Sequence, residues 1–120
     1  MAKLFALIIE DDPKLNEIIC LTLQADFEVE ACADGDIAME LLGNFIPQVV
    51  ILDLNIPGTP GREILTHIRS NNQFARTHVI VTTADNRQAE ILHNDADIVL
   101  LKPVSTTQLR EFALRITSAQ

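Results

Sequence analysis

Short apolar runs alternate with helical patterns along the whole chain. Four of the runs are nearly continuous, which is typical of strands covered on both faces of a parallel sheet, and they occupy residues 4–9, 49–54, 78–83 and 97–101. A fifth run, 27–32, alternates apolar and polar residues. Alternation of this kind is typical of an edge strand, so we expect five strands with 27–32 at an edge.

Helical periodicity fills the intervals between these strands. Apolar residues three and four apart predict four amphipathic helices, whose core-facing stripes are Leu15, Ile18, Ile19 and Leu23; Ile37, Ala38, Leu41, Leu42 and Phe45; Ile64, Leu65 and Ile68; and Leu109, Phe112, Ala113 and Ile116. The segment 86–93 has the weakest pattern, so a short or irregular fourth helix is expected there. Asp12 before Pro13, and Ser105 or Thr106, supply helix starts.

The order of these elements predicts the fold class. Five strand–helix units in strict alternation predict one α/β domain over residues 1–120, with a five-stranded parallel sheet and helices on both faces. By analogy with flavodoxin-like proteins, we expect a doubly wound sheet of strand order 2-1-3-4-5. Ligands of such sheets bind beyond the carboxyl ends of the strands, where the strand order reverses.

Composition and charge narrow the classes of function. The chain has 120 residues, a hydrophobic fraction of 48% and a formal charge of −8. An acidic chain without a basic cluster is a poor candidate for binding nucleic acid or an anionic membrane, and no apolar run approaches the roughly 18 residues that span a bilayer. Cys20 and Cys32 lack the spacing of metal ligands, so we interpret them as reduced, buried thiols of a cytoplasmic protein.

Polar residues follow or end four of the predicted strands, and they are Glu10, Asp11 and Asp12, then Asp53, then Thr83, then Lys102. If the first and third strands are neighbours, their carboxylates converge, and hard oxygen ligands of this kind suit Mg²⁺. Asp53 interrupts a run that should be buried, so its carboxylate needs a partner. Lys102 offers the counter-charge, and Thr83 offers a hydroxyl donor.

Each of these residues also has an ordinary structural explanation. An acidic run after a strand commonly marks a solvated turn or a helix N-terminus, where negative charge is favourable. Lys102 alone fits an exposed strand end, and Thr83 alone fits any strand position. Asp53 in its apolar run favours one shared site over these separate explanations.

Four motifs carry a family resemblance, and each coincides with the end of a predicted strand: "LIIEDD", "VVILDLNIPGTPG", "VIVTTA" and "LLKP". In this order they make the chain resemble the receiver domain of bacterial two-component response regulators over essentially its whole length. The resemblance implies that Asp53 accepts a phosphoryl group from a sensor histidine kinase or a phosphotransfer protein. It also implies a downstream protein partner or a self-dimer as output.

The same resemblance implies a role for the residues around Asp53. Glu10, Asp11 and Asp53, with the backbone carbonyl of Asn55, would bind Mg²⁺, or Mn²⁺ in its place, and Asp12 matches a variable third acid. Thr83 and Lys102 would contact the phosphoryl oxygens. The Lys102–Pro103 bond is expected to be cis, an option essentially limited to proline.

Further residues match the loop and switch positions of the family. Pro57, Gly58 and Gly61 would shape the loop after Asp53, Ala84 would leave space beside Thr83, and Asn55 and Asp85 would tune the decay of the phosphoryl group. The chain departs from the family at Val99, where an aromatic residue is usual, at Asp95 in place of a glycine, and in a shorter segment between Thr83 and Lys102.

Three classes of function remain open on the sequence alone. The first is a phosphoacceptor receiver domain, a signalling protein whose only chemistry is phosphoryl transfer to itself and slow self-dephosphorylation. The second is a receiver-like interaction module that is never phosphorylated. The third is a small Mg²⁺-dependent phosphatase. Such enzymes often carry a general acid two residues after the nucleophile, and Asn55 at that position argues against this class because an amide cannot act as an acid.

Overall fold

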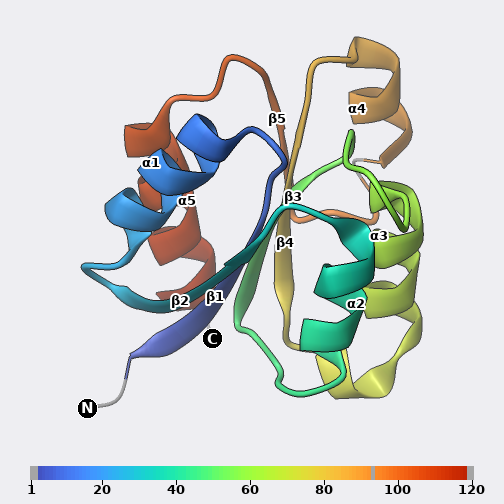
Figure 1. Ribbon diagram of the computed structural model, residues 1–120, viewed down its shortest axis with the longest axis horizontal. Coiled ribbons are helices and arrows are strands. Elements are labelled where there is room, and N and C mark those ends of the chain that lie inside the picture. The colour runs from blue at the N-terminus through green and yellow to red at the C-terminus, as the bar shows by residue number, and fades with distance from the viewer. Residues whose placement is uncertain (1–2, 93, 119–120) are drawn as a thin grey trace.

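The elements of the chain alternate as the sequence predicts. The computed structural model describes residues 3–92 and 94–118. The elements are β1 (Leu4–Ile9), α1 (Pro13–Leu23), β2 (Phe27–Cys32), α2 (Gly35–Leu42), β3 (Val49–Asp53), α3 (Gly61–Ser70), the 3₁₀ turn η1 (Asn72–Phe74), β4 (His78–Thr83), α4 (Asn86–Leu92), β5 (Ile98–Leu101) and α5 (Thr106–Ser118). The five strands form one parallel sheet in the order β2-β1-β3-β4-β5, so the predicted flavodoxin-like topology is confirmed (Figure 1).

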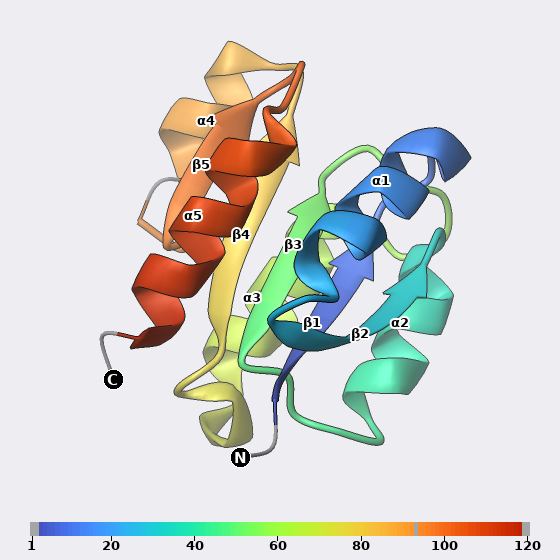
Figure 2. The same cartoon turned by 90° about the vertical axis from the view of Figure 1, so that its left-hand side faces the viewer.

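Helices cover both faces of this sheet. α1 and α5 lie against one face, and α2 and α3 lie against the other, with α4 beside the β5 edge (Figures 1 and 2). Alternate residues of the central strands supply the two apolar cores. Ile8 and Ile51 pack toward α1 and α5, whereas Leu7 and Val50 pack toward α2 and α3. All five residues of β3 are buried, which explains why residues 49–52 are all apolar and makes the Asp53 carboxylate at the end of the strand an exception.

The two edges of the sheet differ from each other. β2 is an edge strand, as its alternating pattern predicts, and it exposes Glu28 and Glu30. β5 forms the other edge although its sequence is continuously apolar, and Leu101 at its end is 46% exposed. Two predicted core positions are also wrong: Ile18 and Ile37 are 48% and 45% exposed. Both residues belong to the apolar stripes predicted for α1 and α2, so periodicity alone overestimates the width of the face that each helix buries.

The element boundaries lie close to the predicted ones. Asp12 is the N-cap of α1, its Oδ1 accepts the Lys14 N–H, and Pro13 begins the helix. The Ser105 hydroxyl oxygen accepts the Gln108 N–H at the start of α5. α4 has seven residues, which confirms a short fourth helix, and His93 at its predicted end lies outside the described residues.

A charged cluster fixes the start of β5 at the amino end of the sheet, opposite the predicted site. The Arg69 guanidinium donates to Asp97 Oδ2 at 2.8 Å and to the carbonyls of Asp95 and Thr77 at 2.6 and 2.9 Å. The same carboxylate accepts the Val79 N–H at 2.6 Å. These charge-assisted hydrogen bonds join α3, β4 and the residue before β5, and so they set the position of β5 in the sheet.

Among the residues that the structure describes, none belongs to a helix with the length and apolarity that crossing a membrane requires.

Candidate functional site

The strand register brings the predicted site residues together at the carboxyl end of the sheet. β1 and β3 are direct neighbours, so Glu10 after β1 lies beside Asp53 at the end of β3. Asp53 pairs with Thr82 of β4, and the Lys102 N–H donates to the Thr83 carbonyl at 2.8 Å. Glu10, Asp53 and Thr83 are all at most 2% exposed. The last residues of β3 and β4 and the residues that follow β1 and β5 therefore form one site.

One ammonium group lies between two buried carboxylates. Lys102 Nζ is 3.0 Å from Asp53 Oδ2 and 3.1 Å from Glu10 Oε1. Both acidic side chains are 2% exposed, whereas that of Lys102 is 26% exposed. A buried carboxylate without a partner is strongly unfavourable, so Lys102 supplies the charge that makes this arrangement tolerable.

The environment shifts the pKa values of two of these groups. Burial raises the pKa of Glu10, and the nearby charge of Asp53 adds to the rise, although hydrogen bonds from the Asp12 N–H and Lys102 oppose it. Burial alone would lower the pKa of Lys102, but its hydrogen bonds to Asp53 and Glu10 outweigh this effect and raise that pKa. Lys102 therefore remains charged at neutral pH.

The acidic residues can hold a cation. One carboxylate oxygen from each of Glu10, Asp11 and Asp53 lies within 4.8 Å of the others. Asp11 is exposed while the other two are buried, so the cluster opens toward solvent on one side. The three carboxylates carry more negative charge than the Lys102 ammonium can balance, so the site can accept a further cation. Two or three carboxylate oxygens suit Mg²⁺, which keeps several waters as its remaining ligands.

Asp12 belongs to the helix and not to this cluster. Its N–H donates to Glu10 Oε2 at 3.0 Å, and its carboxylate caps α1. The acidic run therefore divides into two site residues, Glu10 and Asp11, and one helix cap, Asp12. Asp12, which matches the variable third acid of the resemblance, thus lies outside the group of Glu10, Asp11 and Asp53.

Thr83 connects the site to α4. Its side chain is fully buried, its hydroxyl oxygen accepts the Asp85 N–H at 3.1 Å, and the hydroxyl donates to Gln88 Oε1 at 3.2 Å. Ala84, the next residue, is exposed. Asp85 Oδ1 accepts the Arg87 N–H at 2.8 Å, so Asp85 also stabilises the start of α4.

The loop after Asp53 is held by backbone contacts. The Asn55 N–H donates to Asp53 Oδ1 at 3.0 Å, and the Pro57 carbonyl accepts the Gly35 N–H at 2.8 Å. Gly58 has φ +78°, a left-handed conformation that favours glycine. A Cβ on Gly61 would lie 2.7 Å from Leu54 Cα, so the start of α3 can approach β3 only without a side chain there.

The remaining predicted switch residues lie near β5. The Lys102–Pro103 bond is cis, as expected. Val99 is half-buried and lines a groove between β5 and α4. The contacts of Asn55 and Asp85 do not test their predicted effect on phosphoryl decay, which stays a prediction. The role of the Asn55 carbonyl as a metal ligand also stays a prediction.

Sequence reasoning missed two residues that support the site. The Asn16 side-chain amide donates to the carbonyls of Glu10 and Cys32 at 2.9 and 3.1 Å, which joins the ends of β1 and β2. Gln88 contacts the Thr83 hydroxyl as described above. A single polar residue within a helix has no periodic signal, and only the packing of α1 and α4 reveals these contacts.

Comparison with known proteins identifies the family of the chain. The model of the response regulator receiver domain family matches residues 6–114, so the chain belongs to this family of two-component signalling domains. Its acidic cluster is consistent with the Mg²⁺ site of receiver domains.

Curated relatives include both regulators and kinases. The phosphate regulon transcriptional regulatory protein PhoB of Rhizobium meliloti is 32% identical over 106 residues, which cover 85% of this chain and 47% of that protein. The sensor histidine kinase TmoS of Ectopseudomonas mendocina is 32% identical over 107 residues, 87% of this chain and 11% of the kinase. The chain thus spans less than half the length of these relatives, and a single domain over residues 1–120 stays a prediction.

Solved structures share the fold. The chemotaxis response regulator CheY4 of Vibrio cholerae superposes with a TM-score of 0.86 at 25% identity, covering 96% of this chain and 99% of that one. The receiver domain of the sensor histidine kinase PA1611 from Pseudomonas aeruginosa PAO1, solved with a magnesium ion in its active-site cleft, gives a TM-score of 0.85 at 23% identity. It covers 98% of this chain and 99% of its own.

Proposed function

We propose that this chain is a phosphoacceptor receiver domain that takes a phosphoryl group onto Asp53 from the phosphohistidine of a sensor kinase or a phosphotransfer protein. The observation that carries the proposal is the buried carboxylate of Asp53, which has the Lys102 ammonium 3.0 Å away and the oxygens of Glu10 and Asp11 within reach. A structural ion pair needs only two charged groups. Here charged side chains at the carboxyl ends of three strands, β1, β3 and β5, lie together beside the exposed Asp11.

The transfer step follows from this arrangement. A carboxylate oxygen of Asp53 attacks the phosphorus, the N–P bond of phosphohistidine breaks, and its electron pair stays on the imidazole nitrogen, which takes up a proton from solvent. Lys102 pairs with a phosphoryl oxygen, and Thr83 donates its hydroxyl proton to another. Positive charge and donors already in place lower the barrier where negative charge develops. When bound, Mg²⁺ would be held by Glu10, Asp11, Asp53 and the Asn55 carbonyl and would supply further positive charge.

The product is an acyl phosphate that water hydrolyses without another enzyme. Attack of water on the phosphorus breaks the O–P bond, restores the Asp53 carboxylate and releases inorganic phosphate. Asn55 lies two residues beyond Asp53, and Asp85 lies two residues beyond Thr83. We infer that these two residues set the rate of decay. The domain is therefore a signalling domain whose phosphorylated state decays at a rate of its own, and it does not act as an enzyme on other substrates.

Signalling of this kind needs a partner that distinguishes the two states. The phosphoryl group adds charge at one end of the sheet and alters the contacts of nearby segments, which changes affinity for a downstream protein or for a second copy of the chain. With a formal charge of −8 and no basic cluster, the domain is not expected to bind nucleic acid or membranes directly, and we infer a cytoplasmic location.

Acetyl phosphate tests the proposal because it donates a phosphoryl group without a kinase. The protein is incubated with acetyl phosphate and MgCl₂, and its intact mass is compared with those of Asp53→Asn and Glu63→Gln, an exposed acid on α3 that serves as the matched control. We expect one phosphoryl adduct in the wild type and in Glu63→Gln, and none in Asp53→Asn or after EDTA.

Other outcomes separate the alternatives. A folded protein that gains no adduct is an interaction module, and the proposal is then wrong. Sustained hydrolysis of unrelated phosphate esters, lost in Asp53→Asn, identifies a phosphatase. An adduct that persists in Asp53→Asn places the acceptor elsewhere in the chain.

A further inference from the structure

The single proton of the Thr83 hydroxyl is already in use. The hydroxyl donates to Gln88 Oε1 at 3.2 Å and accepts the Asp85 N–H at 3.1 Å, and the side chain is fully buried. A hydroxyl carries one proton. Thr83 therefore cannot donate to a phosphoryl oxygen on Asp53 while it donates to Gln88, and the two acceptors compete.

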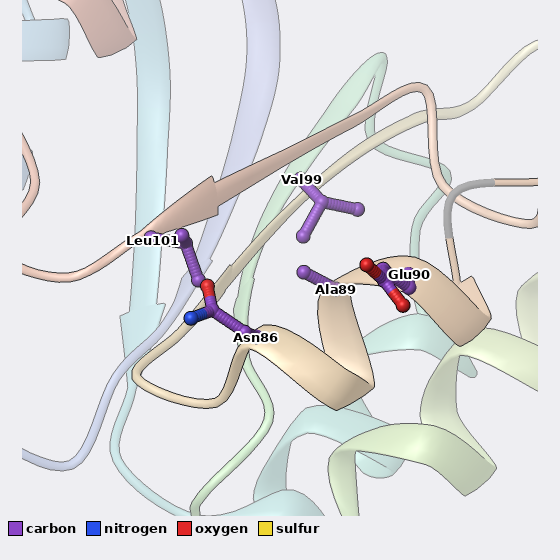
Figure 3. A pocket seen from close by; sticks show the side chains of 5 residues that line it. All are labelled: Asn86, Ala89, Glu90, Val99 and Leu101. Carbon is purple, nitrogen blue, oxygen red and sulfur yellow. The ribbon is translucent and has the colours of Figure 1, made fainter.

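The first turn of α4 has few other attachments to the sheet. Leu92 at the end of the helix is its only buried residue among those described, and Ile91 is 63% exposed. Beside the helix lies a groove of about 780 Å³ lined by Asn86, Ala89, Glu90, Val99 and Leu101. Figure 3 shows the small side chains of Ala89 and Val99 facing each other across it. The hydrogen bond between Gln88 and Thr83 thus joins a lightly packed turn to β4, next to open space.

We propose that Gln88 is a positioning residue that holds the Thr83 proton when Asp53 is free and loses it when Asp53 carries a phosphoryl group. Loss of this bond releases the first turn of α4, whose position relative to the groove then changes. The inference rests on the proposed function, because it requires a phosphoryl group on Asp53. It gives the chain a route from site to surface that does not use an aromatic residue at position 99.

The coupling acts in both directions because linked equilibria are reciprocal. Phosphorylation weakens the attachment of α4, so any partner that holds α4 away from Thr83 favours the phosphorylated state by the same factor. The strength of one neutral hydrogen bond sets the size of this factor, on the order of fivefold.

Gln88→Met isolates the hydrogen bond. Methionine keeps the length and much of the volume of glutamine but lacks the amide oxygen. The probe is beryllofluoride with MgCl₂, which imitates a phosphoryl group on a carboxylate, titrated by calorimetry. We expect Gln88→Met to bind it about fivefold more tightly than the wild type, because no bond to Thr83 has to be broken. Arg87→Ala, an exposed neighbour on α4, is the matched control and should bind as the wild type does.

Two further measurements separate this role from a general effect on folding. Amide hydrogen exchange over Asn86–Leu92 should be faster in beryllofluoride-bound wild type than in the free protein, and equally fast in free Gln88→Met. In a Thr83→Val background, which has no proton to share, Gln88→Met should leave the affinity for beryllofluoride unchanged, so the double-mutant cycle reports the coupling directly.

The outcomes distinguish the inference from the proposed function. Equal affinity in wild type and Gln88→Met, or the same affinity gain in the Thr83→Val background, overturns the inference while Asp53 remains the acceptor. Failure of beryllofluoride to bind the wild type, together with no acetyl phosphate adduct, overturns the proposed function and the inference with it.

Discussion

The charged site and α4 lie at the same end of the sheet, yet they are built in opposite ways. Glu10, Asp53 and Thr83 are at most 2% exposed, and each has hydrogen-bonded or ionic partners from other elements. α4 has one buried residue among its seven, and its Ile91 is 63% exposed. The Thr83–Gln88 hydrogen bond joins the two regions.

This difference shows how a small domain can combine accurate chemistry with an adjustable surface. Electrostatic stabilisation requires charges held in fixed positions, which only a buried and well-paired set of strand ends provides. A response to that chemistry requires an element whose detachment costs little free energy. Three substitutions test whether stability is really divided in this way, and they are given from the largest expected effect to the smallest.

Removal of the Lys102 ammonium should have the largest effect. In EDTA at pH 7, Lys102→Met is expected to lower the free energy of unfolding by about 3 kcal/mol, because it leaves the buried carboxylates of Glu10 and Asp53 without their cation. Urea titration measures the change. Added MgCl₂ should recover part of the loss, since an ion bound by the acids stabilises the folded state.

The pH dependence of this variant checks the cause. Because burial raises the folded-state pKa of Glu10 above its ordinary value of 4.5, protonation of Glu10 stabilises the fold below that value, and this stability is lost as pH rises through the raised pKa. The deficit of Lys102→Met should therefore shrink as pH falls from 7 toward 4.5. A deficit that is independent of both pH and Mg²⁺ would mean that the loss comes from packing of the lysine stem.

Disruption of the charged cluster at the other end of β5 should have an intermediate effect. Asp97→Ala removes the acceptor of the Arg69 guanidinium and of the Val79 N–H, so we expect a loss of about 2 kcal/mol in urea unfolding. Asp95→Ala is the matched control, because Asp95 contributes its backbone carbonyl to Arg69. Similar losses in both variants would contradict a role for the Asp97 carboxylate.

A change on the outer face of α4 should have the smallest effect. Ile91→Ser replaces a side chain that is 63% exposed, so we expect the free energy of unfolding to change by less than about 0.5 kcal/mol. Thermal unfolding monitored by circular dichroism checks this value. A loss comparable to that of Asp97→Ala would show that α4 is firmly packed, and the contrast with the site would then disappear.

The sequence predicts the fold and the charged site because both depend on strand periodicity. Five apolar runs define the sheet, and residues at strand ends meet once the parallel order is assumed, which places Asp53, Glu10 and Lys102 together. Asp53 is the most informative residue, because a carboxylate in a buried run requires a partner wherever the helices lie.

Contacts that depend on helix packing could not be predicted in this way. Asn16 and Gln88 reach their partners only because α1 and α4 have particular rotations against the sheet, and neither position differs in pattern from a solvent-facing residue. The exposure of Ile18 and Ile37 has the same origin. The partial exposure of β5 was not predicted from its own pattern either, since a short apolar run has the same sequence whether one or both of its faces are covered. Only the strand order expected by analogy placed this strand at an edge.

The excess of carboxylates over ammonium groups at the strand ends has a consequence for every comparison of stability. Any divalent cation that these oxygens bind raises the melting temperature in proportion to the logarithm of its concentration once the site is nearly saturated. Folding and ion capture are then aspects of a single equilibrium, and a melting temperature characterises this protein only together with the salt composition in which it was recorded.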